Sequence, residues 1–318
     1  MISAICFDRM PPSSAYHAPV LANEVTELLR ESSAVLDGTL GGGGHSKALL
    51  DAGVQRVIGI DRDPEALTAA TNRLSDFAKA GRFRAFESNY ANIGEIQELA
   101  HARFDGILLD LGVSSHQVDA GGRGFTFRPG APLDMRMGRD SGTDAAGLLN
   151  TEDEMTLGGI FKDYGDEPRG ARLAKEVVRR RENRPFATSD DFVGAIRAVL
   201  GARSGPGDFA RLFQALRIAV NDELDGLGNA LPMLRDRLVP GGTLAVISYH
   251  SGEDRLVKNA FRDWSAACIC PPKQPICTCR GRPLGTTITR RAITASQEEV
   301  VNNPRSRSAK LRAWRNAR

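Results

Sequence analysis

A glycine-rich stretch at residues 37–45, with the sequence Asp-Gly-Thr-Leu-Gly-Gly-Gly-Gly-His, constrains the fold of this chain more than any other segment. It follows a short apolar run at residues 34–36 and precedes a helix-like run at residues 46–52. Glycines between a strand and a helix let the backbone turn tightly and approach a ligand closely, as in doubly wound α/β proteins. The stretch therefore predicts a ligand-binding turn at the edge of a parallel sheet.

The residues around this turn indicate which class of ligand it binds. A second strand, residues 57–60, ends in Asp61, at the distance where a carboxylate can bind ribose hydroxyls. The dinucleotide pattern G-x-G-x-x-G read from Gly41 fails, because Ser46 stands at the third glycine. Asp37 would repel a pyrophosphate but suits a cation. The pattern therefore favours S-adenosyl-L-methionine over a dinucleotide, and an NAD-dependent oxidoreductase or a turn without a ligand remain alternatives.

Strand-like and helix-like segments alternate through the first third of the chain. Strands are predicted at residues 83–86 and 104–110, and a helix is predicted to begin with Asp63 as N-cap and Pro64 at its first position. The strand at residues 104–110 ends in an acid, Asp110, like the first two strands. We therefore expect three acids to lie at one edge of a parallel sheet, where ligands bind in such folds.

The alternation stops after this point. Residues 119–142 are rich in glycine, proline and charge, and residues 150–200 carry helical patterns, including a capping box at residues 188–191. A long helix is predicted from about Asp208. The α/β pattern then returns, with a helix, a turn and a strand predicted at residues 231–238, 240–242 and 243–249.

This order of patterns predicts one α/β domain with an insert, rather than two domains in series. The α/β domain takes residues 1–114 and 216–318, and the all-helical insert takes residues 115–215. With 318 residues, the chain is long enough to bury a sizeable core.

Composition limits the partners and the compartment. No run of about eighteen apolar residues occurs, and residues 1–10 do not resemble a signal peptide, so we expect a cytoplasmic protein without a membrane partner. The net charge of +3 is too small to prove a nucleic-acid partner, but basic residues gather at residues 169–184 and 303–318. These clusters favour a polyanionic substrate, and solvated surfaces are the alternative.

Four of the five cysteines lie close together in the sequence, as Cys268, Cys270, Cys277 and Cys279. Four thiols within twelve residues could bind zinc tetrahedrally. C-x-C pairs are less typical of zinc sites than C-x-x-C pairs, so the pattern favours free or redox-labile thiols over a metal site, and no metal-binding residue is predicted.

The ordered set of motifs resembles the bacterial RsmH (MraW) family. This family methylates the exocyclic N4 amine of a cytidine in the decoding region of small-subunit (16S) ribosomal RNA. A turn followed by a strand, as predicted at residues 239–244, is also typical of class I methyltransferases. The resembling segments are residues 17–21, 37–46, 61–64, 104–117, 123–125, 132–137, 213–218, 248–251, 253–255 and 303–305.

The resemblance implies a class I (Rossmann-like) S-adenosyl-L-methionine-dependent methyltransferase sheet with an inserted all-helical domain. Asp61 can accept hydrogen bonds from both ribose hydroxyls, and Tyr90 can stack on adenine. His45 could instead only pack at the start of a helix, and Gln117 rests on the resemblance alone. The implied cofactor-binding residues are Gly43, Gly44, His45, Asp61, Tyr90, Asp110 and Gln117.

Methylation of this amine sets requirements for the site. The nitrogen is a poor nucleophile, so the protein must hold it near the methyl group and accept its proton. Asp110 is expected to orient the amine or the donor, and Asp134 and His250 are further catalytic candidates. His250 could equally be a structural turn residue. Methylation at carbon five would need a cysteine nucleophile, and no cysteine lies near the strand at residues 104–110.

Substrate contacts are expected from the insert. The implied partner is small-subunit rRNA within an assembled or nearly assembled small subunit, and whether the enzyme is a homodimer stays open. The alternative for the whole chain is a non-catalytic RNA-binding factor. For Phe125 and Phe127 the alternative is ordinary packing, and for the long helix from about Asp208 it is a salt-bridged surface. The candidate substrate residues are Arg123, Phe125, Phe127, Arg136, Arg211, Gln214 and Arg217. Basic residues predicted to share one helix and contact phosphates are Arg172, Lys175, Arg179 and Arg180.

Overall fold

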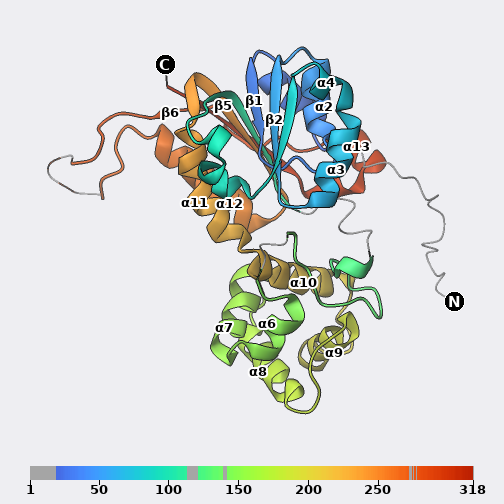
Figure 1. The fold of residues 1–318 in the computed structure, drawn as a ribbon. Coiled ribbons are helices and arrows are strands. Elements are labelled where there is room, and N and C mark those ends of the chain that lie inside the picture. Colours follow the sequence, from blue (N-terminus) through green and yellow to red (C-terminus); the bar gives the residue numbers. More distant parts are fainter. Residues whose placement is uncertain are drawn as a thin grey trace.

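A computed structural model of the chain describes residues 19–112, 121–138, 142–271, 274, 276 and 278–317. Within these residues, a seven-stranded sheet carries helices on both faces, and a body of helices lies at one end of it (Figure 1). The strand order is β3-β2-β1-β4-β5-β7-β6, in which β1 to β5 are parallel and β7 is antiparallel to β5 and β6. This is a doubly wound arrangement with a reversed strand at one side.

The strands of the sheet are β1 (Ala34–Asp37), β2 (Arg56–Asp61), β3 (Phe83–Glu87), β4 (Phe104–Asp110), β5 (Leu238–Ser248), β6 (Gly285–Thr287) and β7 (Lys310–Asn316). The helices around the sheet are α1 (Ala22–Leu29), α2 (Gly44–Asp51), α3 (Pro64–Arg73), α4 (Ser75–Lys79), α11 (Glu223–Arg235), α12 (Ser251–Ser265) and α13 (Gln297–Asn302). Short 3-10 helices are η1 (Tyr90–Glu95), η2 (Gln97–Leu99), η3 (Gly121–Arg123) and η5 (Pro304–Ser308).

The two faces of the sheet bury separate apolar cores. Neighbouring residues of a strand point to opposite faces, so Val35 packs in the core of α1, α2 and α3, whereas Leu36 packs in the core of α11 and α12. Trp314 of β7 lies 5.2 Å from Trp264 and 6.5 Å from Phe261 of α12, measured between ring centroids. The last strand is thus fixed by side-chain packing as well as by its hydrogen bonds.

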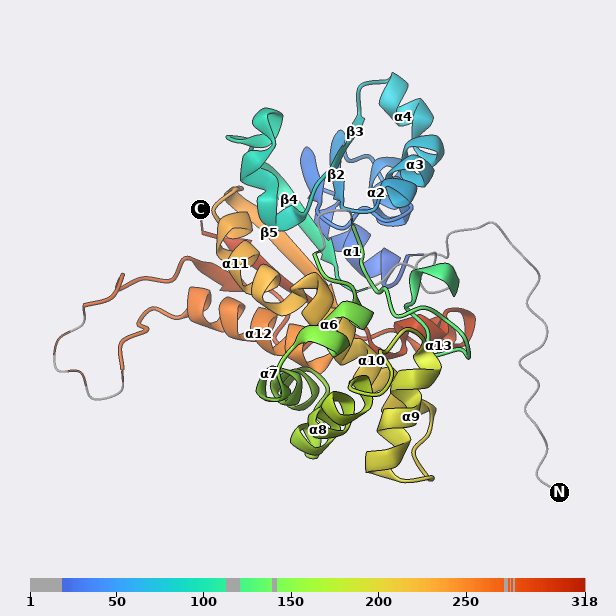
Figure 2. The same ribbon diagram turned by 60° about the horizontal axis from the view of Figure 1, so that its bottom comes forward.

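The body of helices at the end of the sheet, called here the helical insert, has its own core (Figure 2). It consists of α6 (Ala145–Thr151), α7 (Glu154–Gly159), the π-helical turn η4 (Ile160–Tyr164), α8 (Gly170–Arg181), α9 (Ser189–Leu200) and α10 (Pro206–Asn221). Phe192 lies at its centre, 5.7 Å from Phe161 and 5.3 Å from Phe213 between ring centroids. The predicted boundary after residue 215 falls inside α10, which leads directly into α11.

Local signals of helix beginnings are confirmed. Asp63 caps α3 by accepting a hydrogen bond from the backbone of Glu65, and Pro64 opens the helix. The capping box of α9 is present, with Thr188 and Asp191 as its two members. These contacts lie within a few residues of each other, which is why the sequence could predict them.

The predicted elements after α10 are partly wrong. The helix predicted at residues 231–238 ends at Arg235, because Leu238 already pairs with Phe104 as the first residue of β5. The glycines predicted to make a turn lie inside β5, where Gly241 has φ +80° and the pairing with β4 shifts its register. A bulge therefore replaces the expected turn.

Part of the basic cluster at residues 303–318, which favoured a polyanionic substrate, belongs to the sheet. Residues Lys310–Asn316 form β7 inside the sheet, and Leu311, Ala313 and Trp314 are buried. Arg312 Nε lies 2.6 Å from Asp254 Oδ1, so its charge is already paired with α12. Alternation of basic and apolar residues here marks a strand rather than a free tail.

Candidate functional site

The glycine turn joins β1 to α2 at the carboxyl edge of the sheet. Gly41 and Gly43 have φ +50° and +75°, a region that side chains other than glycine disfavour. Asp61 Oδ2 accepts a hydrogen bond of 2.7 Å from Gly41 N, which ties the turn to the end of β2. Gly43 faces away from the cavity, because a Cβ there would meet Ala70 of α3 and Leu74, which follows that helix. The turn is thus shaped both by its glycines and by an acid.

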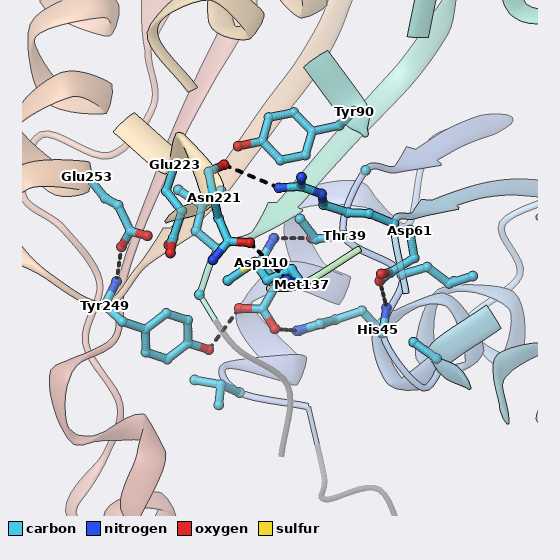
Figure 3. A pocket seen from close by; sticks show the side chains of 18 of the residues that line it. Thr39, His45, Asp61, Tyr90, Asp110, Met137, Asn221, Glu223, Tyr249 and Glu253 are labelled. Carbon is cyan, nitrogen blue, oxygen red and sulfur yellow. Dashed lines mark hydrogen bonds and ion pairs between the residues drawn. The ribbon is translucent and has the colours of Figure 1, made fainter. Parts of the chain in front are cut away.

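A cavity of about 510 Å³ opens between this turn, the carboxyl ends of β4 and β5, and the start of α11 (Figure 3). Residues predicted to bind the donor that line it are Gly44, His45, Asp61, Tyr90 and Asp110. Gly43 faces Ala70 and Leu74 and does not line the cavity, and Gln117 lies outside the described residues. The structure therefore brings together five of the seven predicted positions from four separate segments of the chain.

Asp110 is held by side chains on either side of its carboxylate. Its Oδ1 accepts a hydrogen bond of 2.8 Å from the Tyr249 hydroxyl, and its Oδ2 lies 3.4 Å from His45 Nε2 (Figure 3). Its backbone N–H donates to Thr39 Oγ1 at 2.6 Å. Burial and the neighbouring Asp110 raise the pKa of Tyr249 far above its usual range, so the hydroxyl stays a donor. The carboxylate is thereby fixed in direction within the cavity.

His45 begins α2 and is buried between acids. Burial lowers its pKa, but the hydrogen bond and charge of Asp110 outweigh that effect, so its pKa is raised above the usual value. A cationic imidazole would strengthen its pairing with Asp110. His45 therefore combines helix packing with a polar contact in the cavity.

Asp61 sits at the end of β2 with its carboxylate in the cavity. Its Oδ1 accepts from Asp63 N at 2.9 Å, in addition to the bond with Gly41 N. Burial raises the pKa of Asp61 to about 6, and these backbone hydrogen bonds oppose that shift. Each oxygen keeps a second lone pair, so the group can still accept hydroxyl hydrogen bonds.

This pKa predicts how donor binding depends on pH. Ribose hydroxyls bind the ionised form of the Asp61 carboxylate. This form predominates above pH 6, and it is lost as the pH falls through 6 because the carboxylate becomes protonated. Donor affinity is therefore expected to fall roughly tenfold between pH 7 and pH 5. Calorimetric titration across this range measures it, and Asp61→Asn is the control because asparagine does not titrate. If donor affinity changed with pH equally in the wild type and in Asp61→Asn, the pH dependence would belong to another group.

Asp37 does not take the predicted role of a direct partner for a cationic ligand. Its side chain is 1% exposed and is absent from the described cavity lining. It accepts a hydrogen bond of 2.7 Å from Ser46 Oγ, and burial raises its pKa. Asp37 instead joins the end of β1 to the start of α2.

His250 is a helix cap, and it does not line the cavity. Its Nδ1 accepts from Glu253 N at 3.4 Å, and its Nε2 lies 3.3 Å from Glu253 Oε1. Burial disfavours ionisation of Glu253, but the hydrogen bond and charge of His250 outweigh it and lower the pKa of Glu253. Of the two interpretations of His250, the structural one agrees with these contacts. Glu253, which was not predicted, is the residue that reaches the cavity.

The helical insert contributes its last turn to the cavity. Arg217 of α10 makes two hydrogen bonds to Glu223, at 2.7 and 2.8 Å. Asn221 accepts from Met137 N and donates to Met135 O, both at 2.8 Å, and so connects α10 to the segment before α6. Arg217, a candidate substrate residue, and its neighbour Asn221 thus border the cavity as members of local polar networks.

The catalytic candidate Asp134 and the substrate candidates Arg123 and Arg136 do not line the cavity that contains Asp110. Asp134 and Arg136 form an ion pair with each other, with Asp134 Oδ1 2.7 Å from Arg136 Nε, and neither lines the cavity. Arg123 forms an ion pair with Asp63, the cap of α3. A catalytic role for Asp134 therefore has no support from its position.

The two phenylalanines among the candidate substrate residues differ in their surroundings. Phe127 contacts Phe209 and Phe213 edge to face, each with 6.0 Å between centroids, so it packs in the helical insert. Phe125 is half-buried beside Arg123, whose guanidinium lies 5.9 Å from its ring centroid. Neither phenylalanine lines the cavity.

On the outer part of α10, Arg211 Nη2 lies 2.7 Å from Glu167 Oε2, which agrees with the salt-bridged alternative. Gln214 is half-buried and outside the cavity lining. Sequence reasoning missed Tyr249 and Glu253. The available signals were the position of Tyr249 as the last residue of a predicted strand and the presence of both residues in the segments 248–251 and 253–255 that resemble the family.

No described helix is both long and apolar enough to span a bilayer.

Comparison with known proteins agrees with this geometry. A curated "Ribosomal RNA small subunit methyltransferase H" of Gemmatimonas aurantiaca is 64% identical over 305 residues, which cover 96% of each chain. The protein of the same name from Heliobacterium mobile is 49% identical, covering 93% of this chain and 97% of the relative. A sequence model described as the MraW methylase family matches residues 14–317.

Two solved structures are similar at low identity. An rRNA methylase from Streptococcus thermophilus has a TM-score of 0.40 and 12% identity, covering 93% of this chain and 94% of that one. The N-methyltransferase NodS of Bradyrhizobium japonicum, crystallised with S-adenosyl-L-homocysteine, has a TM-score of 0.41 and 12% identity, covering 95% and 89%.

The sheet order, the glycine turn and the acids at the strand ends define a class I methyltransferase, an enzyme class that uses S-adenosyl-L-methionine as its methyl donor. The predictions of fold class and donor are thereby confirmed. The chain belongs to the MraW methylase family, as its resemblance in sequence implied. The dinucleotide-dependent oxidoreductase is excluded as an interpretation.

Proposed function

We propose that this enzyme methylates the exocyclic N4 amine of a cytidine in the decoding region of small-subunit rRNA, within an assembled or nearly assembled subunit. The observation that carries the proposal is the position of Asp110, whose carboxylate is directed into the cavity by Tyr249 and His45. The names of the relatives, which specify ribosomal RNA of the small subunit, support the class of substrate.

The residues of the cavity fit the donor. The half-buried ring of Tyr90 lies in the same cavity as the Asp61 carboxylate, which suits an adenine stacked on one and a ribose bound to the other (Figure 3). The backbone of Gly44 and the side chain of His45 border the rest of the donor site. When bound, the donor supplies a methyl group on a positively charged sulfur.

Asp110 has two tasks in this proposal. Its carboxylate orients the amine by accepting a hydrogen bond, which directs the nitrogen lone pair towards the methyl carbon. As the nitrogen–carbon bond forms and the carbon–sulfur bond breaks, the amine loses a proton, which Asp110 is placed to accept. His45 and Tyr249 act as positioning residues, because both contact Asp110.

An amine is favoured over carbon five of cytosine by the composition of the cavity. Methylation at carbon five requires a covalent cysteine nucleophile. Among the described residues, the cavity lining contains no cysteine. Direct attack by nitrogen needs no covalent intermediate with the protein and agrees with this lining.

The test is a transfer assay on the natural class of substrate. Purified enzyme is incubated with donor labelled in its methyl group and with small ribosomal subunits from a strain that lacks this methylation, and the labelled rRNA is digested to nucleosides. Label in N4-methylcytidine is the expected result, and label in 5-methylcytidine would contradict the proposal. Binding of subunits without any transfer, under conditions where the donor binds, would instead support the non-catalytic RNA-binding factor.

Helix α8 is proposed to contact rRNA phosphates. Leu173 and Val177 are buried in the insert, whereas Arg172 and Lys175 are exposed. Glu176 pairs with both Arg179 and Arg180, each at 2.7 Å, so these two arginines offer less charge to RNA than predicted.

Charge reversal at Lys175 tests this surface. Each phosphate contact adds to the salt dependence of binding, so Lys175→Glu is expected to reduce the slope of log affinity against log salt by about one unit or less. The measurement is rRNA binding over a salt series, with Lys79→Glu of α4 as the matched control at the opposite end of the molecule (Figure 1). Identical slopes for the wild type and both variants would make α8 an ordinary solvated helix.

A further inference from the structure

The connection between α12 and β6, residues 266–284, lies apart from the methyl-donor cavity. In Figure 2 its continuously described parts, residues 266–271 and 278–284, extend beyond the end of α12 and the edge of the sheet. Its described residues are absent from the cavity lining. The catalytic proposal therefore gives this segment no task, although it carries the cysteine cluster.

Three cysteines of this connection converge in space. The sulfur atoms of Cys268, Cys270 and Cys279 all lie within 4.8 Å of one another. Cys268 Sγ and Cys279 Sγ are 3.7 Å apart, whereas a disulfide would hold them at about 2.05 Å. Tetrahedral zinc with Zn–S bonds of about 2.3 Å requires neighbouring sulfurs about 3.8 Å apart. The observed separation fits two thiolates on one zinc ion.

The backbone around the sulfurs also suits thiolate ligands. Ile269 N–H donates to Cys279 Sγ at 3.4 Å, and the Cys270 sulfur accepts from the backbone of Thr278 and Cys279. Such N–H donors stabilise negative charge on sulfur. The first part of the connection, residues 268–270, therefore lies against the later part, residues 278–279. Backbone N–H groups of each part donate to a cysteine sulfur of the other.

The ends of the connection are fastened to the protein body. Arg280 Nη2 donates to the carbonyls of Asp263 and Ala266 at the end of α12. Near its tip, Gln274 Nε2 donates to Thr278 Oγ1 at 2.8 Å. Between these two points, within the described residues, buried apolar side chains are lacking. A metal ion would supply the cross-link that a small apolar core cannot.

We propose that Cys268, Cys270 and Cys279 bind one Zn²⁺ ion as thiolates, forming a structural site that closes this connection. Thiolate ligands favour zinc over magnesium or calcium, and each thiol releases its proton on binding. A tetrahedral ion has a fourth position for a further ligand, and Cys277 lies outside the described residues. Because the site is separate from the cavity, donor binding should not depend on the metal.

The test is the metal content of the full-length protein purified with a thiol reductant and Zn²⁺. The wild type is expected to hold about one Zn²⁺ per chain. Inductively coupled plasma mass spectrometry measures this content. After removal of zinc by a chelator, Co²⁺ should give the intense thiolate-to-metal absorption band. Cys268→Ser, Cys270→Ser and Cys279→Ser should each weaken Co²⁺ binding at least about tenfold.

Cys6→Ser is the matched control, because Cys6 is remote in sequence from the cluster and should leave metal binding unchanged. Donor affinity of every variant, measured by calorimetry, checks that the protein has folded. Reduced wild-type protein that neither retains zinc nor gives the cobalt band would overturn the proposal. Unchanged metal content in all three cluster variants, with normal donor affinity, would overturn it as well.

Discussion

Replacement of Asp110 by asparagine is expected to lower kcat by about 100-fold or more, while the dissociation constant of the donor changes by less than about threefold. Asparagine has nearly the same shape and can still accept a hydrogen bond from Tyr249. It is a far weaker proton acceptor than a carboxylate, and it orients the amine less strongly. The loss should therefore appear in turnover, measured with saturating rRNA substrate, rather than in donor affinity measured by calorimetry.

Tyr249→Phe is the matched control for Asp110. It removes the hydroxyl that donates to Asp110 Oδ1 and leaves the carboxylate in place. Loss of one positioning hydrogen bond should lower kcat by about fivefold to tenfold, well below the effect of Asp110→Asn. Equal losses of donor affinity and turnover in Asp110→Asn would mean that this residue serves the donor alone.

Asp61→Ala is expected to raise the dissociation constant of the donor by about 30-fold to 100-fold, which corresponds to about 2–3 kcal/mol. Two ribose hydroxyls lose a charged acceptor, and Gly41 N and Asp63 N lose the partner that shapes the glycine turn. Asp61→Asn should have a smaller effect, because its amide oxygen can replace one of these contacts. Calorimetric titration measures both variants.

The fold of the Asp61 variants needs a separate measurement. Asp61 is half-buried at the edge of the sheet, and its raised pKa means that the ionised carboxylate is disfavoured there, so its removal should not greatly lower the unfolding temperature. A folded Asp61→Ala protein with unchanged donor affinity would remove Asp61 from the donor site. A variant that unfolds would instead indicate that the glycine turn depends on its carboxylate.

Sequence reasoning located the elements whose cause is local. The acids at the ends of β1, β2 and β4 could be predicted because a parallel strand that ends in an acid leaves that acid at the carboxyl edge of the sheet. Asp63 as the cap of α3 depends on contacts two residues away. The positions that line the cavity from these segments, such as Asp61 and Asp110, were predicted for the same reason.

The errors share a different cause, which is the distance along the chain between partners. Tyr249 meets Asp110 across 139 positions, and Arg312 meets Asp254 across 58. No local pattern reveals such pairs, so the sequence indicated only a basic cluster where the structure has the strand β7. Phe127 was a candidate for contact with the substrate and His250 a candidate for catalysis. Phe127 instead packs against Phe209, which is distant in sequence, and His250 caps α12.

The place of β7 between β5 and β6 has a consequence for how the protein is made. The core of the helical insert uses a continuous part of the chain, from Leu133 to Leu216, so it can form while synthesis continues. The sheet lacks an inner strand until residues Lys310–Asn316 have been translated and have left the ribosome. Donor binding should therefore be acquired only after this strand has been made and has paired with β5, and a nascent chain without these residues exposes the edges of β5 and β6 to chaperones or to aggregation.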